Sequence, residues 1–259
     1  MSSPLRKPLI AGNWKMHLTL AQSLELARAV RDGVGDAASE VALCVPFTAL
    51  ALVAETLRGS RVRLGAQDLH WETQGAFTGE ISPVQLVDAG ATMTIIAHSE
   101  RRRYFNETDE AVNKKLRAAL AAKLVPILCI GETLEEREAQ RTFKVLQTQL
   151  EGGLKGFAPV DLAPLVIAYE PVWAIGTGKT ATPDQAQQAH LFVRKTCARL
   201  YGEGFASGCR ILYGGSVKAD NVDRLMAEPD IDGALVGGDS LKAASFLRIV
   251  HFQAPAAAR

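Results

Sequence analysis

The sequence has no long hydrophobic run and almost no excess of charge of either sign. Nowhere do eighteen apolar residues follow one another, and the first residues lack the apolar stretch of a secretion signal. The net charge of +1 gives no general attraction to nucleic acid or to an anionic membrane. These absences predict a soluble globular protein of the cytoplasm that binds any anionic ligand through local groups.

Cysteine is scarce, and its spacing does not suggest metal binding. The four cysteines, Cys44, Cys129, Cys197 and Cys209, are scattered, and three of them lie in or beside apolar runs. This pattern favours reduced thiols that pack as small hydrophobic side chains. The sequence therefore predicts no metal site and no disulfide framework.

One unit recurs along the chain: a short apolar run, a connection rich in Gly, Pro, Asn or Ser, and an amphipathic stretch of helical period. The eight apolar runs are residues 8–13, 41–45, 62–66, 93–97, 125–130, 165–169, 210–213 and 233–236, and a last helix is expected over 241–250. Eight such units in 259 residues predict a closed (β/α)8 barrel of the TIM type, with eight parallel strands inside eight helices. We expect residues 1–259 to form a single domain with a frayed tail at about 253–259.

Two nucleotide-binding alternatives fit the sequence poorly. A doubly wound open sheet is the rival architecture, but its G-x-G-x-x-G fingerprint is absent after the first strand. Residues 176–180 suggest a Walker loop, yet Trp173 stands where that motif requires a glycine. A nucleoside triphosphatase is therefore not expected.

Glu170 is the first candidate for catalysis. It directly follows the apolar run 165–169 and is followed by Pro171 and by a Gly-rich loop that carries Trp173. A carboxylate at the end of a buried strand is either costly or useful, and the loop after it has the composition of a lid. The alternative for Glu170 alone is a solvated side chain in an ordinary surface loop.

Polar residues also follow other strands, at what a barrel would make a single rim. Asn13 and Lys15 lie two apart after the first strand, where an extended backbone would point both toward one ligand. His98 follows the fourth strand at the start of a turn or helix, whose partial positive charge favours a neutral imidazole. Each has a simpler explanation, namely a solvated Lys beside a turn-forming Asn and a structural His.

Two Gly-rich strand ends suggest a phosphate site. Gly214, Gly215 and Ser216 follow the seventh strand, and Gly237 and Gly238 follow the eighth. Adjacent glycines at the last two strands of a barrel let a ligand approach backbone N–H groups. Tight turns explain each pair singly, but they do not explain why both fall at the last two strands.

Taken together, these motifs resemble those of the triosephosphate isomerase family. AGNWKM, AHSERRRYFNET, CIGET, AYEPVWAIGTGKTAT, YGGSV and LVGGDSL stand in the order and at the approximate spacing of that family. The resemblance runs from Ala11 nearly to the end of the chain. It implies the interconversion of dihydroxyacetone phosphate and glyceraldehyde 3-phosphate through an enediolate, without a metal or a redox cofactor.

The resemblance also implies a role for each site residue. Glu170 would move the proton between adjacent carbons, neutral His98 would donate to the carbonyl oxygens, and Lys15 would supply a fixed positive charge beside Asn13. The phosphate would be held by Gly176 of a lid over residues 172–180 and by Ser216, Gly237 and Gly238. Glu100 and Cys129 also match family motifs: Glu100 would pair with Lys15 or exchange protons, and Cys129 would tune packing.

The long connection 67–82 resembles a loop that such enzymes insert into a partner subunit, with Thr78 at its tip. The resemblance therefore implies a homodimer, and a loop of this length is uncommon unless it is functional. Two residues depart from the family pattern. His17 is expected to point past the site, whereas Asp239 either caps a helix or brings a carboxylate close to the phosphate.

Other functions remain open at this stage. A phosphosugar aldolase could use Lys15 as a Schiff-base nucleophile on the same fold. A catalytically silent barrel could bind a sugar phosphate without chemistry, although the presence of Glu170, His98 and Lys15 together argues against it. A scaffold role would leave no trace in the sequence.

Overall fold

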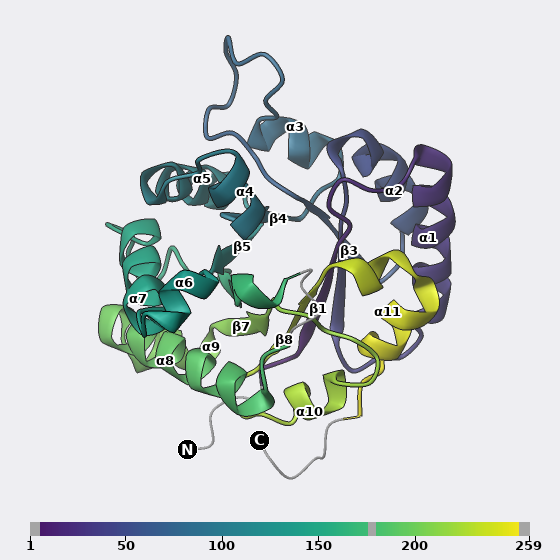
Figure 1. The fold of residues 1–259 in the computed structure, drawn as a ribbon. Helices are drawn as coiled ribbons and strands as arrows, with labels where there is room; N and C mark the ends of the chain where they lie inside the picture. The colour runs from purple at the N-terminus through teal and green to yellow at the C-terminus, as the bar shows by residue number, and fades with distance from the viewer. Residues whose placement is uncertain (1–5, 176–179, 254–259) are drawn as a thin grey trace.

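The computed structural model describes residues 6–175 and 180–253, in which eight parallel strands close into a barrel (Figure 1). The strands are neighbours in sequence order, and the first pairs with the last. They are β1 (Leu9–Asn13), β2 (Glu40–Cys44), β3 (Val62–Ala66), β4 (Met93–Ile96), β5 (Val125–Ile130), β6 (Val166–Tyr169), β7 (Arg210–Tyr213) and β8 (Gly233–Val236). The predicted parallel barrel is confirmed, with each strand within one residue of its expected bounds.

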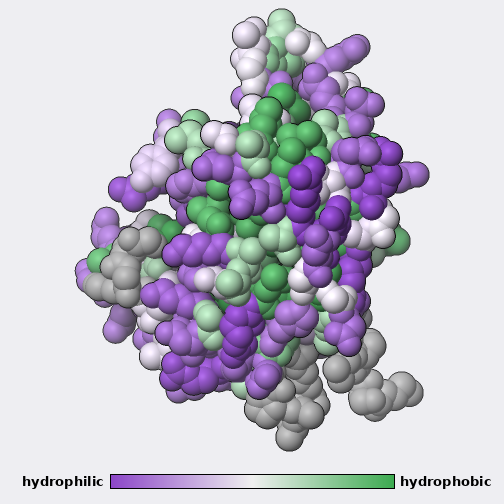
Figure 2. Space-filling view, turned by 90° about the vertical axis from the view of Figure 1, so that its right-hand side faces the viewer, coloured by the Kyte–Doolittle hydropathy of each residue, from purple (hydrophilic) through white to green (hydrophobic). Residues whose placement is uncertain are grey.

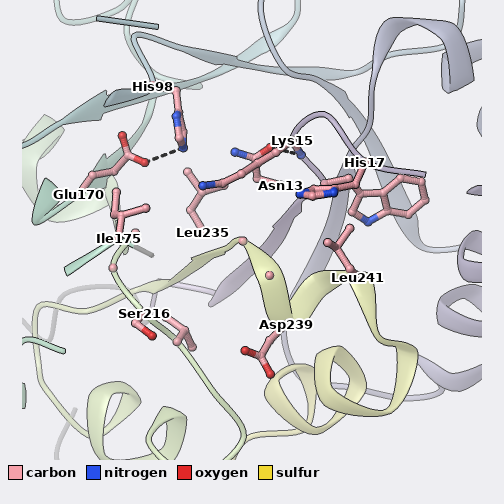
Figure 3. A pocket seen from close by; sticks show the side chains of 16 residues that line it. Asn13, Lys15, His17, His98, Glu170, Ile175, Ser216, Leu235, Asp239 and Leu241 are labelled. Carbon is pink, nitrogen blue, oxygen red and sulfur yellow. Dashed lines mark hydrogen bonds and ion pairs between the residues drawn. The ribbon is translucent and has the colours of Figure 1, made fainter. Parts of the chain in front are cut away.

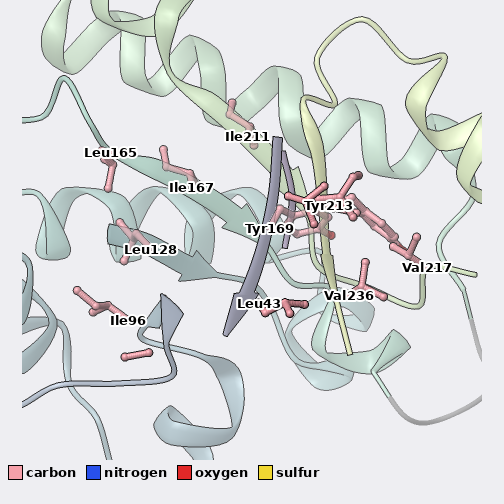
Figure 4. Close-up of a cluster of buried hydrophobic side chains, with 14 of the residues drawn as sticks. Leu43, Ile96, Leu128, Leu165, Ile167, Tyr169, Ile211, Tyr213, Val217 and Val236 are labelled. Carbon is pink, nitrogen blue, oxygen red and sulfur yellow. The ribbon is translucent and has the colours of Figure 1, made fainter. Parts of the chain in front are cut away.

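Both faces of the strands are buried, which explains their unbroken apolar runs. Side chains of a strand alternate between its two faces, so in β1 Leu9 and Ala11 fill the barrel while Ile10 packs outside it. The outer layer joins the strands to the surrounding helices and includes Leu128 and Ile211 (Figure 4). Double burial of this kind is the usual condition of a parallel sheet.

Eleven α-helices surround the strands in the described part of the chain. They are α1 (Leu20–Gly33), α2 (Leu50–Leu57), α3 (Pro83–Asp88), α4 (Ser99–Tyr104), α5 (Asp109–Ala121), α6 (Leu134–Glu138), α7 (Thr142–Gly153), α8 (Pro183–Tyr201), α9 (Glu203–Gly208), α10 (Val222–Met226) and α11 (Ala243–Val250). Three short 3₁₀ helices complete the set: η1 (Phe47–Ala49), η2 (Val172–Ala174) and η3 (Gly238–Leu241).

The helix layer is more divided than the eight expected helices, because three connections each carry two. A residue with positive φ interrupts each of these connections: Asn106 (54°) between α4 and α5, Gln140 (56°) between α6 and α7, and Gly202 (87°) between α8 and α9. A left-handed residue cannot continue a right-handed helix, so a new helix must begin after it.

The last expected helix, 241–250, is also divided. Lys242 has extended backbone angles, so η3 ends before it and α11 begins at Ala243. The backbone N–H of Gln253 donates to Asp223 Oδ1 at 2.8 Å, so the chain is held as far as this residue. The rest of the expected frayed tail lies outside the described residues.

Residues 67–82 form a projecting loop without helix or strand (Figure 1). The base of the loop is closed by a hydrogen bond from His70 N–H to Ile81 O at 2.9 Å, and residues 72–80, which include Thr78, are exposed. The Phe77 side chain in this loop is 44% exposed, and Figure 2 shows hydrophobic surface at and below the projection. The loop thus presents apolar groups on one side of the molecule.

Candidate active site

The predicted site residues meet at one cavity of about 310 Å³ at the carboxyl ends of the barrel strands (Figure 3). The cavity is lined by Asn13 and Lys15 after β1, His98 after β4, Glu170 after β6, Ser216 after β7, and Gly237 and Gly238 after β8. Gly176, also predicted as a phosphate ligand, lies outside the described residues, as do residues 177–179 of the expected lid 172–180. The carboxyl ends of the strands are the face where barrels of this type carry their chemistry.

Glu170 is a buried carboxylate and not a solvated surface residue. The residue is only 2% exposed. Its Oε1 lies 2.8 Å from His98 Nε2, and its Oε2 accepts the backbone N–H of Ser99 at 2.9 Å. Burial raises the pKa of Glu170, but the contacts with His98 and Ser99 lower it by more, so the pKa lies below its ordinary value. These partners favour the ionised form of a carboxylate that is buried.

Two glycines let Glu170 sit where it does. A Cβ at Gly131 would come within 1.7 Å of Glu170 O, and a Cβ at Gly214 would come within 2.8 Å of Glu170 Cγ. A Cβ at Gly215 would come within 2.2 Å of the Tyr213 hydroxyl. Gly214 and Gly215 therefore make room for the protein's own groups. Both also line the cavity, and the approach of a ligand to their backbone stays a prediction.

The glycines after β8 behave differently. A Cβ at Gly237 would be in ordinary contact with Lys15 Cε at 3.4 Å, and a Cβ at Gly238 would have no neighbour within 4 Å among the described residues. The space beside these two glycines, next to the Lys15 side chain, is therefore open to a ligand. Their position agrees with the prediction of a phosphate site at this strand end.

His98 caps the N-terminus of α4 with its imidazole. Its Nδ1 accepts the backbone N–H of Glu100 at 3.2 Å, which assigns the proton of a neutral ring to Nε2. Burial lowers the pKa of His98, but the Glu170 carboxylate raises it by more, so the pKa lies above its ordinary value. The direction is opposite to that expected from the helix N-terminus alone, because the sequence did not reveal the contact with Glu170.

Lys15 reaches the cavity from a turn and not from an extended segment. Its φ is 53°, and its backbone N–H donates to Asn13 Oδ1 at 3.0 Å. The expectation that both side chains extend from one face of a strand was therefore wrong, although both line the cavity. The Lys15 ammonium lies 2.6 Å from Glu100 Oε1, which agrees with the first of the two roles considered for Glu100.

His17 and Asp239 also line the cavity. The expectation that His17 points past the site was wrong; it lies at the rim as an exposed residue (Figure 3). The side chain of Asp239, at the start of η3, has no hydrogen bond or ion pair within residues 6–175 and 180–253, so the described contacts give this carboxylate no capping role. A partly exposed carboxylate therefore faces the proposed phosphate end of the site.

Sequence analysis missed Glu132, which anchors the chain after Glu170. This fully buried carboxylate accepts hydrogen bonds from Trp173 Nε1 at 2.9 Å and from the Tyr169 hydroxyl at 3.1 Å. Its backbone carbonyl accepts the N–H of Val172 at 3.0 Å. An acidic residue within the motif CIGET was the only sequence signal for this role.

The cysteines are packed as expected. All four are buried free thiols, and burial raises the pKa of Cys129 well above its ordinary value of 9.0. A neutral thiol at this position fits a packing role. In the described residues no group of three or more metal-ligating side chains could hold a metal ion, and no helix is long and apolar enough to cross a membrane.

The fold and the cavity define a class of enzyme. A parallel (β/α)8 barrel that brings a buried carboxylate, an imidazole and an ammonium together at the carboxyl ends of its strands is a barrel enzyme equipped for proton transfer on an anionic substrate. Comparison with known proteins narrows this class to one family. The family model described as triosephosphate isomerase matches residues 8–253.

Individual relatives agree with the family model. The triosephosphate isomerase of Citrifermentans bemidjiense is 57% identical over 249 residues, which cover 96% of this chain and 99% of the relative. That of Roseiflexus sp. is 55% identical, with 96% and 98% covered. A crystal structure of triosephosphate isomerase from Bartonella henselae is similar with a TM-score of 0.85 and 41% identity, over 94% of this chain and 97% of that one. The chain belongs to the triosephosphate isomerase family and is an isomerase.

Proposed function

We propose that the chain interconverts dihydroxyacetone phosphate and D-glyceraldehyde 3-phosphate and that Glu170 is the base. Family membership supports the reaction, and the buried, ionised Glu170 carboxylate at the cavity wall carries the assignment of the base. Glu170 removes a proton from one carbon and returns it to the adjacent carbon. The intermediate is an enediolate, and the reaction needs no external electron acceptor.

His98 is proposed as the acid partner of Glu170. Its Nε2 lies 2.8 Å from Glu170 Oε1, and a substrate oxygen bound next to this nitrogen could accept the proton that it carries (Figure 3). A neutral imidazole can donate this proton and recover it as the double bond moves. Asn13 is proposed to add a second donor to the substrate oxygen.

Lys15 is proposed to stabilise the negative charge that develops on the substrate. A unit charge about 4 Å from an oxyanion contributes on the order of 4 kcal/mol at an effective dielectric constant of about 20. The phosphate is proposed to lie against Ser216, Gly237 and Gly238, where the cavity is open beside Lys15. Gly176 stays a predicted fourth ligand.

The structure supports neither of the two alternative functions, the phosphosugar aldolase and the catalytically silent barrel. A Schiff-base lysine needs its nitrogen free to attack a carbonyl carbon, whereas Lys15 Nζ is paired with Glu100 Oε1 at 2.6 Å. A silent binding barrel would not need a buried acid–base pair. The relatives are isomerases by name, so neither alternative is retained.

Assembly and location are part of the proposal. The exposed loop 67–82, with Thr78 at its tip and apolar Phe77 beside it, is proposed to dock against a second copy of the chain near Asn13 and Lys15. Hydrophobic surface at and below the loop supports a homodimer (Figure 2). The cytoplasm is the proposed compartment, by the composition argument above.

A coupled assay tests the function directly. Conversion of glyceraldehyde 3-phosphate is followed with the wild type and with Glu170→Ala, while circular dichroism checks that both are folded. Fast turnover that is lost in the folded variant supports both the reaction and its base. A folded wild type without turnover would contradict the proposed function.

A further inference from the structure

Three buried charged residues and the partly exposed Arg101 form a network beside the active site. Lys115 Nζ lies 2.6 Å from Asp68 Oδ1 and also pairs with Glu107, while Arg101 Nη2 lies 2.8 Å from Asp68 Oδ2. Asp68, Glu107 and Lys115 are less than 9% exposed. The two cations and the two carboxylates balance, as buried ion pairs require. None of the four lines the catalytic cavity.

The network joins the base of the projecting loop to α4, the helix that His98 caps. Asp68 lies just after β3, two residues before the hydrogen bond that closes the loop at His70. Arg101 lies in the first turn of α4, directly after Glu100. Lys115 lies on α5, so three separate elements meet at one carboxylate.

The position of α4 depends on such polar contacts because the helix has no buried residue of its own. Most helices are fixed by an apolar face, which α4 lacks. Yet its N-terminus supplies three contacts of the proposed mechanism: His98 against Glu170, Ser99 N–H to Glu170, and Glu100 to Lys15. A small rotation of α4 would move all three together.

We infer that Asp68 is a positioning residue that fixes α4, through Arg101, in the orientation that catalysis requires. Its two carboxylate oxygens bind different cations, Oδ1 to Lys115 and Oδ2 to Arg101. Among the described carboxylates, only Asp68 lies within 3 Å of the Arg101 guanidinium. Glu107 Oε1 is farther away, at 3.5 Å from Arg101 Nε. The inference rests on the proposed function of His98 and Glu170.

The substitution Asp68→Asn tests this role. The amide keeps the shape of the side chain, but its nitrogen cannot accept a hydrogen bond, so one of the two cations loses its partner. Displacement of a catalytic group by about 1 Å can cost on the order of a hundredfold in rate. A smaller displacement of α4 is expected to lower kcat by about tenfold or more. KM is expected to change by less than about threefold, because the open phosphate end at Gly237 and Gly238 lies on another strand.

Asp232→Asn is a matched control. Asp232 is also buried and also binds two cations through separate oxygens, Arg6 at 2.6 Å and Arg194 at 2.7 Å. It precedes β8, at the opposite end of the barrel from the cavity. We expect Asp232→Asn to lower the thermal midpoint Tm as Asp68→Asn does, but to leave kcat within about twofold of the wild type. A fall in kcat in Asp68→Asn alone would therefore reflect the position of α4 and not a general loss of stability.

The variants are compared with the wild type at a protein concentration where all have the same mass by sedimentation, and well below each Tm. If Asp68→Asn does not fold, the charge-balanced pair Asp68→Asn with Lys115→Gln takes its place and is expected to show the same fall in kcat. If the wild type is active and whichever of these variants folds has the wild-type kcat, the positioning role is overturned, whereas the proposed function is not. A wild type without isomerase activity would overturn the proposed function as well.

Discussion

Glu170 and His98 are in direct contact: Oε1 of the buried carboxylate lies 2.8 Å from Nε2 of the imidazole. The pair joins the end of β6 to the start of α4, and the two residues are more than seventy positions apart in the chain. Each group changes the pKa of the other in the direction that favours charge on both. The position of one side chain therefore sets the protonation of the other, and both properties can be tested by substitution.

Shortening the proposed base should slow the reaction without unfolding the protein. Glu170→Asp withdraws the carboxylate by one methylene, roughly 1 Å, and is expected to reduce kcat by on the order of a hundredfold. Steady-state kinetics with glyceraldehyde 3-phosphate measure the effect, and Glu203→Asp on the exposed surface of α9 serves as the control. A near-normal kcat in Glu170→Asp would show that another group is the base.

The pKa of His98 should fall when the neighbouring charge is removed. In the wild type the Glu170 carboxylate raises this pKa above its ordinary value of 6.5, against the effect of burial. In Glu170→Gln burial, the largest effect, is opposed only by the Glu100 carboxylate, so we expect the pKa to fall below its wild-type value. NMR titration of the imidazole protons measures the change.

His190 provides an internal reference for that titration. It is fully buried, and burial lowers its pKa to about 4, so its signals should not move above pH 5 in either protein. An unchanged or higher pKa for His98 in Glu170→Gln would contradict the contact. Because a raised pKa in the folded state stabilises the protein at low pH, the stability gained from His98 should decline as pH rises above 6.5.

Gly214 should be needed for the placement of Glu170. A methyl group at this position would lie 2.8 Å from Glu170 Cγ, so Gly214→Ala is expected to displace the carboxylate and lower kcat by about tenfold or more. Gly204→Ala, where a Cβ meets nothing within 4 Å among the described residues, is the matched control and should keep full activity. Equal kcat in both variants would argue against the close fit around the base.

Asp239 should weaken the binding of an anionic substrate. Its carboxylate lines the cavity without a partner in the described chain, and Asp239→Ala is expected to lower KM by roughly threefold or more with little change in kcat. Asp36→Ala, an exposed site before β2, changes the net charge equally and should leave KM unchanged. If both variants shift KM alike, the effect belongs to the overall charge and not to the site.

The loop 67–82 should control assembly. Thr78→Arg places a charge at the proposed tip of the docking segment and is expected to weaken dimer formation by at least about tenfold, with loss of activity at low protein concentration. Val160→Arg, at a 78% exposed position before β6, is the control. Sedimentation velocity over a range of concentrations distinguishes the two, and a Thr78→Arg protein with wild-type mass at every concentration would rule out the proposed interface.

The strands could be predicted closely because burial on both faces leaves continuous apolar runs, as in β5 and β6. The site residues could be predicted because they follow those runs. Their contacts could not, since the approach of Ser99 N–H to Glu170 depends on two strand ends meeting in space. The turn at Lys15 was also missed, because a positive φ at a non-glycine residue is set by the surrounding structure and not by the residue itself.

The pairing of β1 with β8 has a consequence for the order in which the protein matures. During synthesis β1 leaves the ribosome first and β8 last. The pairing of β1 with β8 can therefore form only after nearly the whole chain has been synthesised. Asn13 and Lys15 follow the earliest strand, while Gly237 and Gly238 follow the latest. A nascent chain can therefore hold seven strands and the acid–base pair, and still lack Gly237 and Gly238 of the proposed phosphate site.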